Sequence, residues 1–148
     1  MNSAKVIIIG AGPVGTFVAY CLAEYGIETI LLESEASCET DMRASTFHPS
    51  TLKYLDNLNL ANELIDKGLK APIFQYRIRA TDEILEFNLE ELSDVLDFPF
   101  RLQCEQYKFA RMLADKLDNH KYSSVMFNRE LISFSDAGNK VKLKVDHK

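Results

Sequence analysis

A short glycine-rich segment constrains the fold of this chain more than any other feature. Gly10-Ala11-Gly12-Pro13-Val14-Gly15 holds half of the six glycines in the 148 residues. It follows the β-branched run at residues 5–9, which is typical of a strand covered on both faces. Helical spacing begins at Pro13, and a second apolar run occupies residues 29–33. Two parallel strands joined by a right-handed helical crossover are therefore predicted.

The predicted helix carries its large apolar residues on one stripe, which is the face expected to be buried. These residues are Val14, Phe17, Val18, Cys21, Leu22 and Tyr25. Gly26 follows where a left-handed residue would end the helix.

Each glycine of the segment matches a physical requirement for binding a dinucleotide. Gly10 permits a tight turn, Gly12 lets the backbone approach a pyrophosphate, and Gly15 brings the helix close to the strand. The N-terminal amides and dipole of the helix favour the phosphate charge. Pro13 suits the first helical turn because its missing N–H is not needed there. The segment therefore predicts a dinucleotide site, in preference to a purely structural turn.

An acidic residue follows at the spacing that such a site requires. Glu33 ends the second apolar run, about 20 residues beyond the glycines, where a carboxylate is expected to bind the ribose hydroxyls. The same charge would repel a 2′-phosphate, so NADP is disfavoured at this site. The alternative interpretation is that Glu33 is a solvated acid at the end of a strand.

The rest of the chain mixes short helices with antiparallel hairpins. Ser50 is expected to cap a short helix, and a second short helix is expected to end near Gly68. Residues 73–89 alternate as a hairpin that turns near Asp82. Helical spacing returns from Cys104. A short strand at residues 124–127 and a hairpin at 130–146, turning at 136–139, complete the pattern.

Composition and charge exclude several classes of function. The net charge of −5 makes a nucleic acid an improbable partner, and no stretch is long enough to span a bilayer. The three cysteines have neither metal-binding nor redox spacing, so no metal site is predicted and reduced thiols in a cytoplasmic protein are expected. We see no linker between domains, and the whole of residues 1–148 is expected to belong to one nucleotide-binding domain.

Beyond Glu33 the sequence resembles the FAD-dependent aromatic hydroxylases, flavoprotein monooxygenases related to para-hydroxybenzoate hydroxylase. Three segments carry the resemblance: the glycine segment with Glu33, residues 41–52 with the Leu58-Asn59-Leu60 that follows, and residues 101–107 at the start of a helix. The resemblance implies an α/β fold, with a Rossmann-like FAD-binding βαβ unit, an inserted antiparallel hairpin and a C-terminal β-hairpin. It also implies that residues 73–98 begin the sheet of the substrate domain.

The resemblance also implies further cofactor residues. Arg43 is expected near the pyrophosphate and ribose of FAD, with a surface ion pair to Asp41 or Glu39 as the alternative. Gln103 is expected at the ribityl–pyrophosphate region, although a glutamine there is equally able to cap its own helix. Val125 is expected to pass the adenine through its backbone.

Other residues allow two interpretations each. Arg101 is a weaker cofactor candidate than Gln103. His48 precedes a proline and is expected to serve in capping or packing, in preference to acid–base catalysis. Phe74 and Tyr76 are expected to be core residues, with an aromatic substrate as the alternative neighbour.

The implied activity is hydroxylation of a phenolic or other aromatic compound, with NADH or NADPH reducing the FAD and O₂ supplying the oxygen. The cofactor carries this chemistry, so no catalytic residue is identified and the oligomeric state stays open. Family members are much longer, and the chain is expected to be the truncated N-terminal part of one, or else a short self-contained flavoprotein. The rival functions are a halogenase or isoprenoid reductase of the same fold, and a non-catalytic NAD- or FAD-binding sensor.

Overall fold

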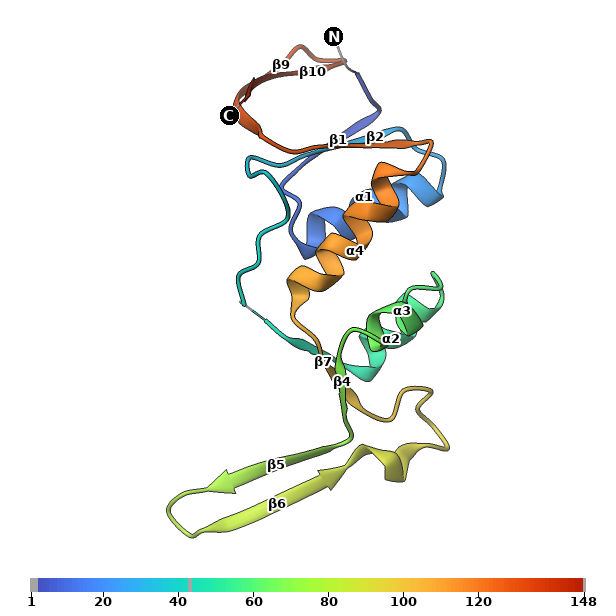
Figure 1. Ribbon diagram of the computed structural model, residues 1–148, viewed down its shortest axis with the longest axis vertical. Coiled ribbons are helices and arrows are strands. Elements are labelled where there is room, and N and C mark those ends of the chain that lie inside the picture. The colour runs from blue at the N-terminus through green and yellow to red at the C-terminus, as the bar shows by residue number, and fades with distance from the viewer. Residues whose placement is uncertain (1–2, 43, 148) are drawn as a thin grey trace. The chain divides into compact units, whose positions relative to one another are not determined.

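The computed structural model describes residues 3–42 and 44–147, which form two compact units. The first unit consists of Met1–Asp41 and Tyr107–Lys148, and the second consists of Met42–Gln106. The second unit is therefore inserted into the sequence of the first. The chain is a mixture of helices, parallel strands and antiparallel hairpins, which confirms the predicted α/β class (Figure 1).

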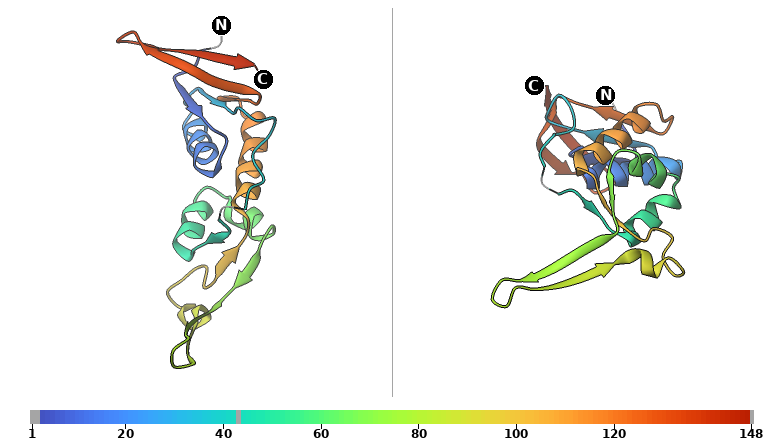
Figure 2. Two further views of the ribbon diagram at one scale, coloured as in Figure 1. Left: turned by 90° about the vertical axis from the view of Figure 1, so that its left-hand side faces the viewer. Right: turned by 60° about the horizontal axis from the view of Figure 1, so that its bottom comes forward.

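The first unit is built on a parallel sheet of three strands in the order β1-β2-β8. Strands β1 (Val6–Ile9), β2 (Thr29–Leu32) and β8 (Ser123–Met126) run in one direction. Helices α1 (Pro13–Glu24) and α4 (Gln106–Asp118) lie on one side of this sheet (Figures 1 and 2). The predicted strand–helix–strand unit and the later helix and strand are confirmed.

Burial differs between the first two strands. All residues of β2 are buried, but β1 is only half-buried and the side chain of Ile9 is 48% exposed. The expectation that β1 is covered on both faces is therefore wrong. Among the described residues β1 is an outer strand beside β2 alone, and α1 and α4 cover one side of the sheet, so its side chains are covered less than those of the central strand β2.

Helix α1 buries a different face from the one its large apolar residues predict. Val14 is 76% exposed and Tyr25 is 84% exposed, so the predicted stripe does not form the core contact. The buried residues of the helix are Thr16, Ala19 and Ala23. Small side chains suit this face because the close approach of helix and strand at Gly15 leaves little space between them. Phe17 still contacts α4, with its ring centroid 5.9 Å from that of Phe109.

A hairpin completes the first unit. Strands β9 (Arg129–Asp136) and β10 (Val141–His147) pair antiparallel, with a register shift between Lys144 and Val145. Gly138 adopts a positive φ of 84° in the turn, as a tight hairpin connection requires. The predicted hairpin and its turn are confirmed.

The second unit has a helical part and a small sheet. Helices α2 (Pro49–Asp56) and α3 (Ala61–Ile65) follow strand β3 (Thr46–Phe47), and β4 (Leu69–Ala71) and β7 (Arg101–Gln103) complete an antiparallel sheet in the order β3-β7-β4. Its core consists of buried leucines: Leu52, Leu55, Leu60, Leu64 and Leu102. Both short helices were predicted, but α2 begins at Pro49 with His48 at its N-cap, so the expected cap at Ser50 is wrong.

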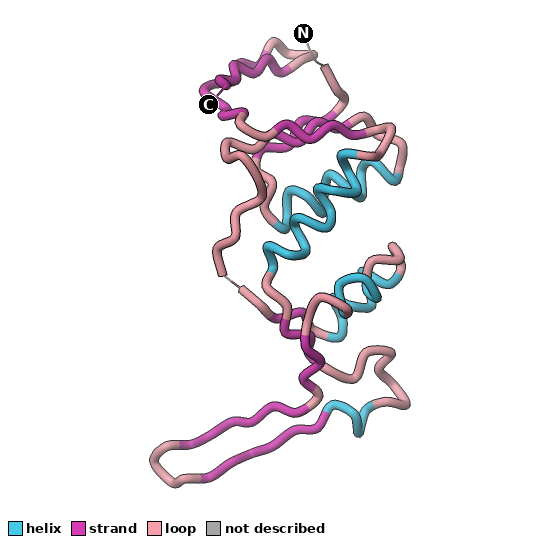
Figure 3. Tube along the Cα trace, in the orientation of Figure 1, coloured by secondary structure: helices cyan, strands magenta, loops and turns pink. Residues whose placement is uncertain are grey.

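A long hairpin extends the second unit (Figure 3). Strands β5 (Ile73–Ile78) and β6 (Glu83–Asn88) pair antiparallel, with Asp82 at a positive φ of 57° in the turn, and a 3₁₀ helix η1 (Leu89–Leu92) follows. The predicted hairpin is confirmed. Phe74 is only partly buried and Tyr76 is 62% exposed, so the interpretation of these two residues as core is wrong.

The described part of the chain carries neither a membrane-spanning helix nor a cluster of metal-binding side chains. Within it no helix is long and apolar enough to cross a membrane. In the same residues, no group of three or more His, Cys, Asp or Glu side chains could hold a metal ion.

Candidate nucleotide site

The glycine segment forms a tight connection between β1 and α1. Gly10 has a φ of +99°, which favours glycine, and its N–H donates to the Leu32 carbonyl at 2.7 Å. A Cβ at Gly15 would lie 2.0 Å from the Gly10 carbonyl oxygen, so the helix could not approach the strand if Gly15 carried a side chain. The predicted roles of Gly10 in the turn and of Gly15 in helix–strand packing agree with this geometry.

Gly12 differs from Gly15 because its surroundings are open. A Cβ built at Gly12 meets no atom within 4 Å, although the extended backbone (φ −73°, ψ 177°) would accept any residue. Free space beside the backbone is what the close approach of a pyrophosphate requires. Gly12 is therefore not explained by packing or by backbone conformation within the described residues.

The N-terminus of α1 has the electrostatics of an anion site. Gly12 is the N-cap residue and supplies no side-chain cap, Pro13 occupies the first turn, and that turn contains no acidic residue. The N–H groups of the first turn and the positive end of the helix dipole then favour a negatively charged ligand. Val14 follows Pro13 in the same turn, and its side chain is largely exposed.

The carboxylate of Glu33 is bonded to the glycine segment. Its Oε2 accepts from the backbone N–H of Ala11 at 2.7 Å, and its Oε1 accepts from the N–H of Glu35 at 3.0 Å and from Ser34 Oγ at 3.1 Å. Because the carboxylate is held in this way, Glu33 is not merely a solvated acid at the end of a strand.

These contacts also determine the charge of Glu33. Burial raises the pKa of the carboxyl group, but the hydrogen bonds from Glu35, Ala11 and Ser34 outweigh burial and hold the pKa below its ordinary value. The group is therefore ionised at neutral pH. A fixed negative charge beside the glycine segment suits ribose hydroxyls and opposes a 2′-phosphate.

The neighbouring strand β8 supports the same region. Val125 pairs with Leu31 in the parallel register, and the Met126 carbonyl accepts from the N–H of Glu33 at 2.9 Å. The structure thus brings the glycine segment, Glu33 and the Val125 strand together in the first unit.

The remaining predicted residues belong to the second unit or are not described. Gln103 lies in β7, and its Oε1 accepts from Thr46 Oγ1 at 3.1 Å. Helix α4 begins three residues later, at Gln106, so the interpretation of Gln103 as a helix cap is wrong. Arg43 lies outside the described residues. His48 occupies the N-cap position of α2 without a side-chain cap bond.

Two supporting residues were missed by sequence reasoning. Thr46 contacts Gln103 across a strand pair too short to show any periodicity. Arg111 of α4 donates to the Cys38 carbonyl at 3.5 Å, which ties the segment after Glu33 to the helix. The sequence signal for Arg111 is a basic residue one helical turn after Tyr107. In the structure Arg111 Cζ lies 5.5 Å from the ring centroid of Tyr107.

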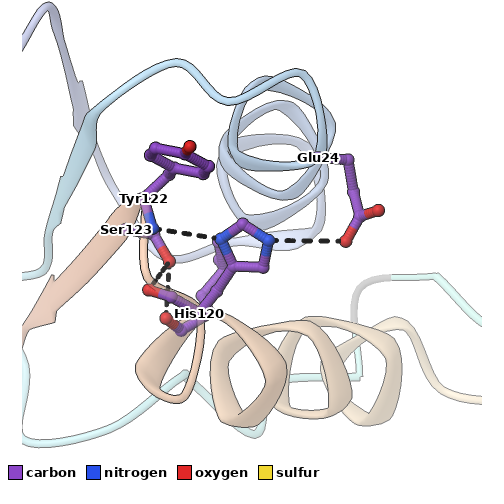
Figure 4. A network of polar contacts seen from close by, with 5 residues as sticks. Glu24, His120, Tyr122 and Ser123 are labelled. Atoms are coloured by element: carbon purple, nitrogen blue, oxygen red, sulfur yellow. Dashed lines mark hydrogen bonds and ion pairs between the residues drawn. The ribbon is translucent and has the colours of Figure 1, made fainter.

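A polar network joins the C-terminal ends of α1 and α4 (Figure 4). His120 Nε2 lies 3.7 Å from Glu24 Oε1, and His120 Nδ1 accepts from the Tyr122 N–H at 3.3 Å. Ser123 Oγ donates to the Leu117 carbonyl. Because Glu24 ends α1 and the glycine segment begins it, this network holds the helix at the end away from the glycine segment.

The residues of the first unit therefore fit a bound dinucleotide. They supply an open backbone at Gly12, uncapped helix amides, and an ionised carboxylate at Glu33. A pyrophosphate needs the first two features, and ribose hydroxyls need the third.

Comparison with known proteins agrees with this geometry. At 32% identity over 113 residues, the chain is similar to 6-hydroxy-3-succinoylpyridine 3-monooxygenase of Pseudomonas putida, covering 76% of this chain and 29% of that protein. It is 28% identical over 112 residues to para-nitrophenol 4-monooxygenase of a Pseudomonas species, and the match covers 76% of this chain and 28% of that protein. The chain thus spans less than a third of these relatives.

A solved structure shows the same fold. The crystal structure of p-nitrophenol 4-monooxygenase from Pseudomonas putida superposes with a TM-score of 0.87 at 23% identity, over 96% of this chain and 36% of that one. The family model described as FAD binding domain matches residues 3–148, which is nearly the whole sequence. The expected resemblance is confirmed, and the chain belongs to the FAD binding domain family.

Proposed function

We propose that this chain is the N-terminal, FAD-binding part of a flavin-dependent monooxygenase that hydroxylates a phenolic or other aromatic compound with NAD(P)H and O₂. The observation that carries the proposal is the ionised Glu33 bonded to a glycine segment whose second glycine faces open space. Family membership and the aromatic monooxygenases among the relatives support the reaction class. When bound, FAD supplies the redox chemistry, and the protein supplies binding, orientation and exclusion of water.

The candidate cofactor residues of the first unit each have a proposed part in holding FAD. Gly10, Gly12, Pro13, Val14 and Gly15 form the backbone cradle for the pyrophosphate. Glu33 accepts from the ribose hydroxyls with the carboxylate that Ala11 and Glu35 already orient. The backbone at Val125 lies beside the adenine.

Two residues outside the first unit are proposed as cofactor residues as well. Gln103 contributes an amide whose oxygen is held by Thr46, so that its nitrogen is the end that donates to a ligand. Arg43 contributes a guanidinium, which suits a pyrophosphate through paired hydrogen bonds.

The wider setting of the protein is part of the same proposal. Residues 73–98 begin the sheet of a substrate domain, and the exposed aromatic side chains of the hairpin support that assignment. The cytoplasm is the proposed location, which is supported by free thiols at Cys21, Cys38 and Cys104.

The proposal is tested by titrating the chain with FAD while following flavin fluorescence, with NADH as competitor. We expect saturable FAD binding that NADH does not displace. Binding of both dinucleotides without preference would favour a sensor over a flavoenzyme. A folded chain that binds neither would contradict the proposed site. Hydroxylation is then assayed on a chain that includes the substrate domain, with phenols as substrates and an isoprenoid or halide as the controls for the rival enzymes.

A further inference from the structure

Arg101 carries a buried hydrogen-bond donor that the described part of the chain leaves unpaired. Its Nε is buried, and no acceptor among the described residues lies within hydrogen-bond reach. Native proteins pair nearly all such groups, because an unpaired buried donor weakens the folded state. A guanidinium offers donors only, so the missing partner must be an acceptor.

An aromatic ring holds the guanidinium in place. Arg101 Cζ lies 4.5 Å from the ring centroid of Phe74, and the Phe74 ring is stacked on that of Phe87 at 5.0 Å. Tyr76 meets both rings edge-on. A cation this close to the face of a ring is attracted to it, so the aromatic cluster restrains the Arg101 guanidinium.

A second polar side chain lies on the same face of the small sheet. Arg101 and Gln103 are two residues apart in β7, so their side chains share one face about 7 Å apart along the strand. Leu102 between them points to the opposite face and is fully buried. Thr46, the partner of Gln103 across the sheet, holds the amide oxygen and leaves the amide nitrogen as the donor end.

On the β5–β6 hairpin, Glu86 and Arg77 are both hydrogen-bonded to Gln75. Gln75 and Glu86 are paired across β5 and β6, on the face opposite to Phe74 and Phe87. Gln75 Nε2 donates to Glu86 Oε2 at 2.7 Å, and the guanidinium of Arg77 donates to Gln75 Oε1 at 2.7 and 3.0 Å. Arg77 is thus an exposed arginine whose Nε is paired, in contrast to Arg101.

We propose that Arg101 binds an anionic oxygen of a ligand through its Nε–H, with the Gln103 amide as the second donor on the same face. A donor-only cation beside a second donor selects an acceptor that carries negative charge. This inference rests on the proposed function, which provides two ligands that carry such an oxygen. One is the phosphate of the dinucleotide, and the other is the carboxylate or phenolate of an aromatic ligand that contacts Phe74 and Tyr76.

The direct test is nuclear magnetic resonance of the arginine Nε–H groups in the ¹⁵N-labelled chain. The Arg101 signal is identified by its loss in Arg101→Lys, and the signal of Arg77 serves as an internal reference. The chain is titrated separately with inorganic pyrophosphate, with FAD, and with benzoate, and benzyl alcohol is the neutral match for benzoate. We expect the Arg101 signal to shift saturably with an anion and not with benzyl alcohol, while the Arg77 signal stays in place.

The titrants separate the two sources. A shift with pyrophosphate and FAD assigns the phosphate, and a shift with benzoate alone assigns the aromatic anion. No shift with any of the three anions, or an equal shift with benzyl alcohol, would overturn the proposal. Flavin fluorescence in the same samples reports FAD binding by itself. The failure of the proposed function is therefore visible separately from the failure of Arg101 to respond to an anion.

Variants provide a second measurement. Arg101→Gln should weaken binding of the anion identified above about tenfold to a hundredfold, because a charged hydrogen bond is lost. The matched variant Arg77→Gln removes a charge of the same kind from the neighbouring β5–β6 hairpin and should leave the affinity unchanged. Equal affinities for the two variants would contradict a specific role of Arg101. If Arg101→Gln does not fold, the resonance titration of the unaltered chain still decides the question.

Discussion

The strand β2 and the hairpin strand β5 have similar apolar content but opposite environments. Every residue of β2 is buried between strands and helices, whereas nearly all of β5 is exposed on both faces. The charged group that directly follows β2, Glu33, has both of its oxygens hydrogen-bonded inside the first unit. The charged group beside the β5 hairpin, Arg101, has a buried nitrogen without a partner in the described residues.

This difference separates two kinds of binding surface. The first unit builds its site from groups that already support one another, so only the ligand has to be added. The hairpin presents exposed aromatic rings beside a donor of β7 that the described residues leave unpaired, and we propose that a ligand completes its contacts. The first surface is expected to be sensitive to small steric changes, and the second to changes of charge.

The largest effect is expected at Gly15. Substitution by alanine places a Cβ where the Gly10 carbonyl oxygen lies, and the helix must move away from the strand. We expect Gly15→Ala to lower the free energy of unfolding by roughly 3 kcal/mol or more, as for other severe steric clashes. Chemical denaturation measures this loss. An unfolding midpoint equal to that of the unaltered chain would contradict the tight packing of α1 on β1.

The next effect contrasts the core of the second unit with its hairpin. Leu52 is fully buried, and Leu52→Ala should cost about 2–5 kcal/mol of unfolding free energy. Tyr76 is 62% exposed, and Tyr76→Ser should cost less than about 1 kcal/mol because only ring-to-ring contacts are lost. Thermal unfolding of the two variants checks the contrast. A larger loss for Tyr76→Ser would mean that the hairpin face is covered in solution.

The sequence predicts features that depend on neighbouring residues, and it misses features that depend on residues far apart in the chain. The glycine segment, Glu33 and both hairpins have short-range signatures, and their placement was predicted. The sheet β3-β7-β4 was not predicted, because strands of two or three residues carry no measurable alternation. The buried face of α1 was predicted wrongly, because Gly15 lets the helix approach the sheet so closely that Ala19 and Ala23 fit where larger residues do not.

The candidate site shows the same division. The roles of Gly10 and Gly15 could be predicted from their positions between strand and helix. The bond between Glu33 and the Ala11 N–H joins residues that are 22 apart in sequence, and it depends on how β2 lies beside the segment. The bond between Thr46 and Gln103 spans 57 residues and has no sequence signature.

A smaller effect is expected from the charge of Glu33. Glu33→Gln removes a carboxylate that accepts from two backbone N–H groups, and we expect a loss of about 1–3 kcal/mol at neutral pH. Because folding lowers the pKa of Glu33, its contribution to stability is present above the pKa of the unfolded chain. The contribution is lost as the pH falls through the lower pKa of the folded chain.

Denaturation at several pH values measures this dependence. The difference between the unaltered chain and Glu33→Gln should be constant near neutral pH and should shrink in acid. The matched variant Glu91→Gln alters an exposed acid of η1 and should show a difference near zero throughout. A Glu33→Gln difference that grows in acid would contradict the hydrogen-bonded, ionised carboxylate.

We infer that the dinucleotide approaches the backbone through the open space beside Gly12. The most direct measurement is the FAD affinity of Gly12→Ala compared with the unaltered chain, by flavin fluorescence, together with the unfolding midpoint of both. The added methyl group meets no protein atom and suits the extended backbone, so the midpoint should be unchanged while the affinity falls about tenfold. Equal FAD affinity in the two proteins would contradict the claim.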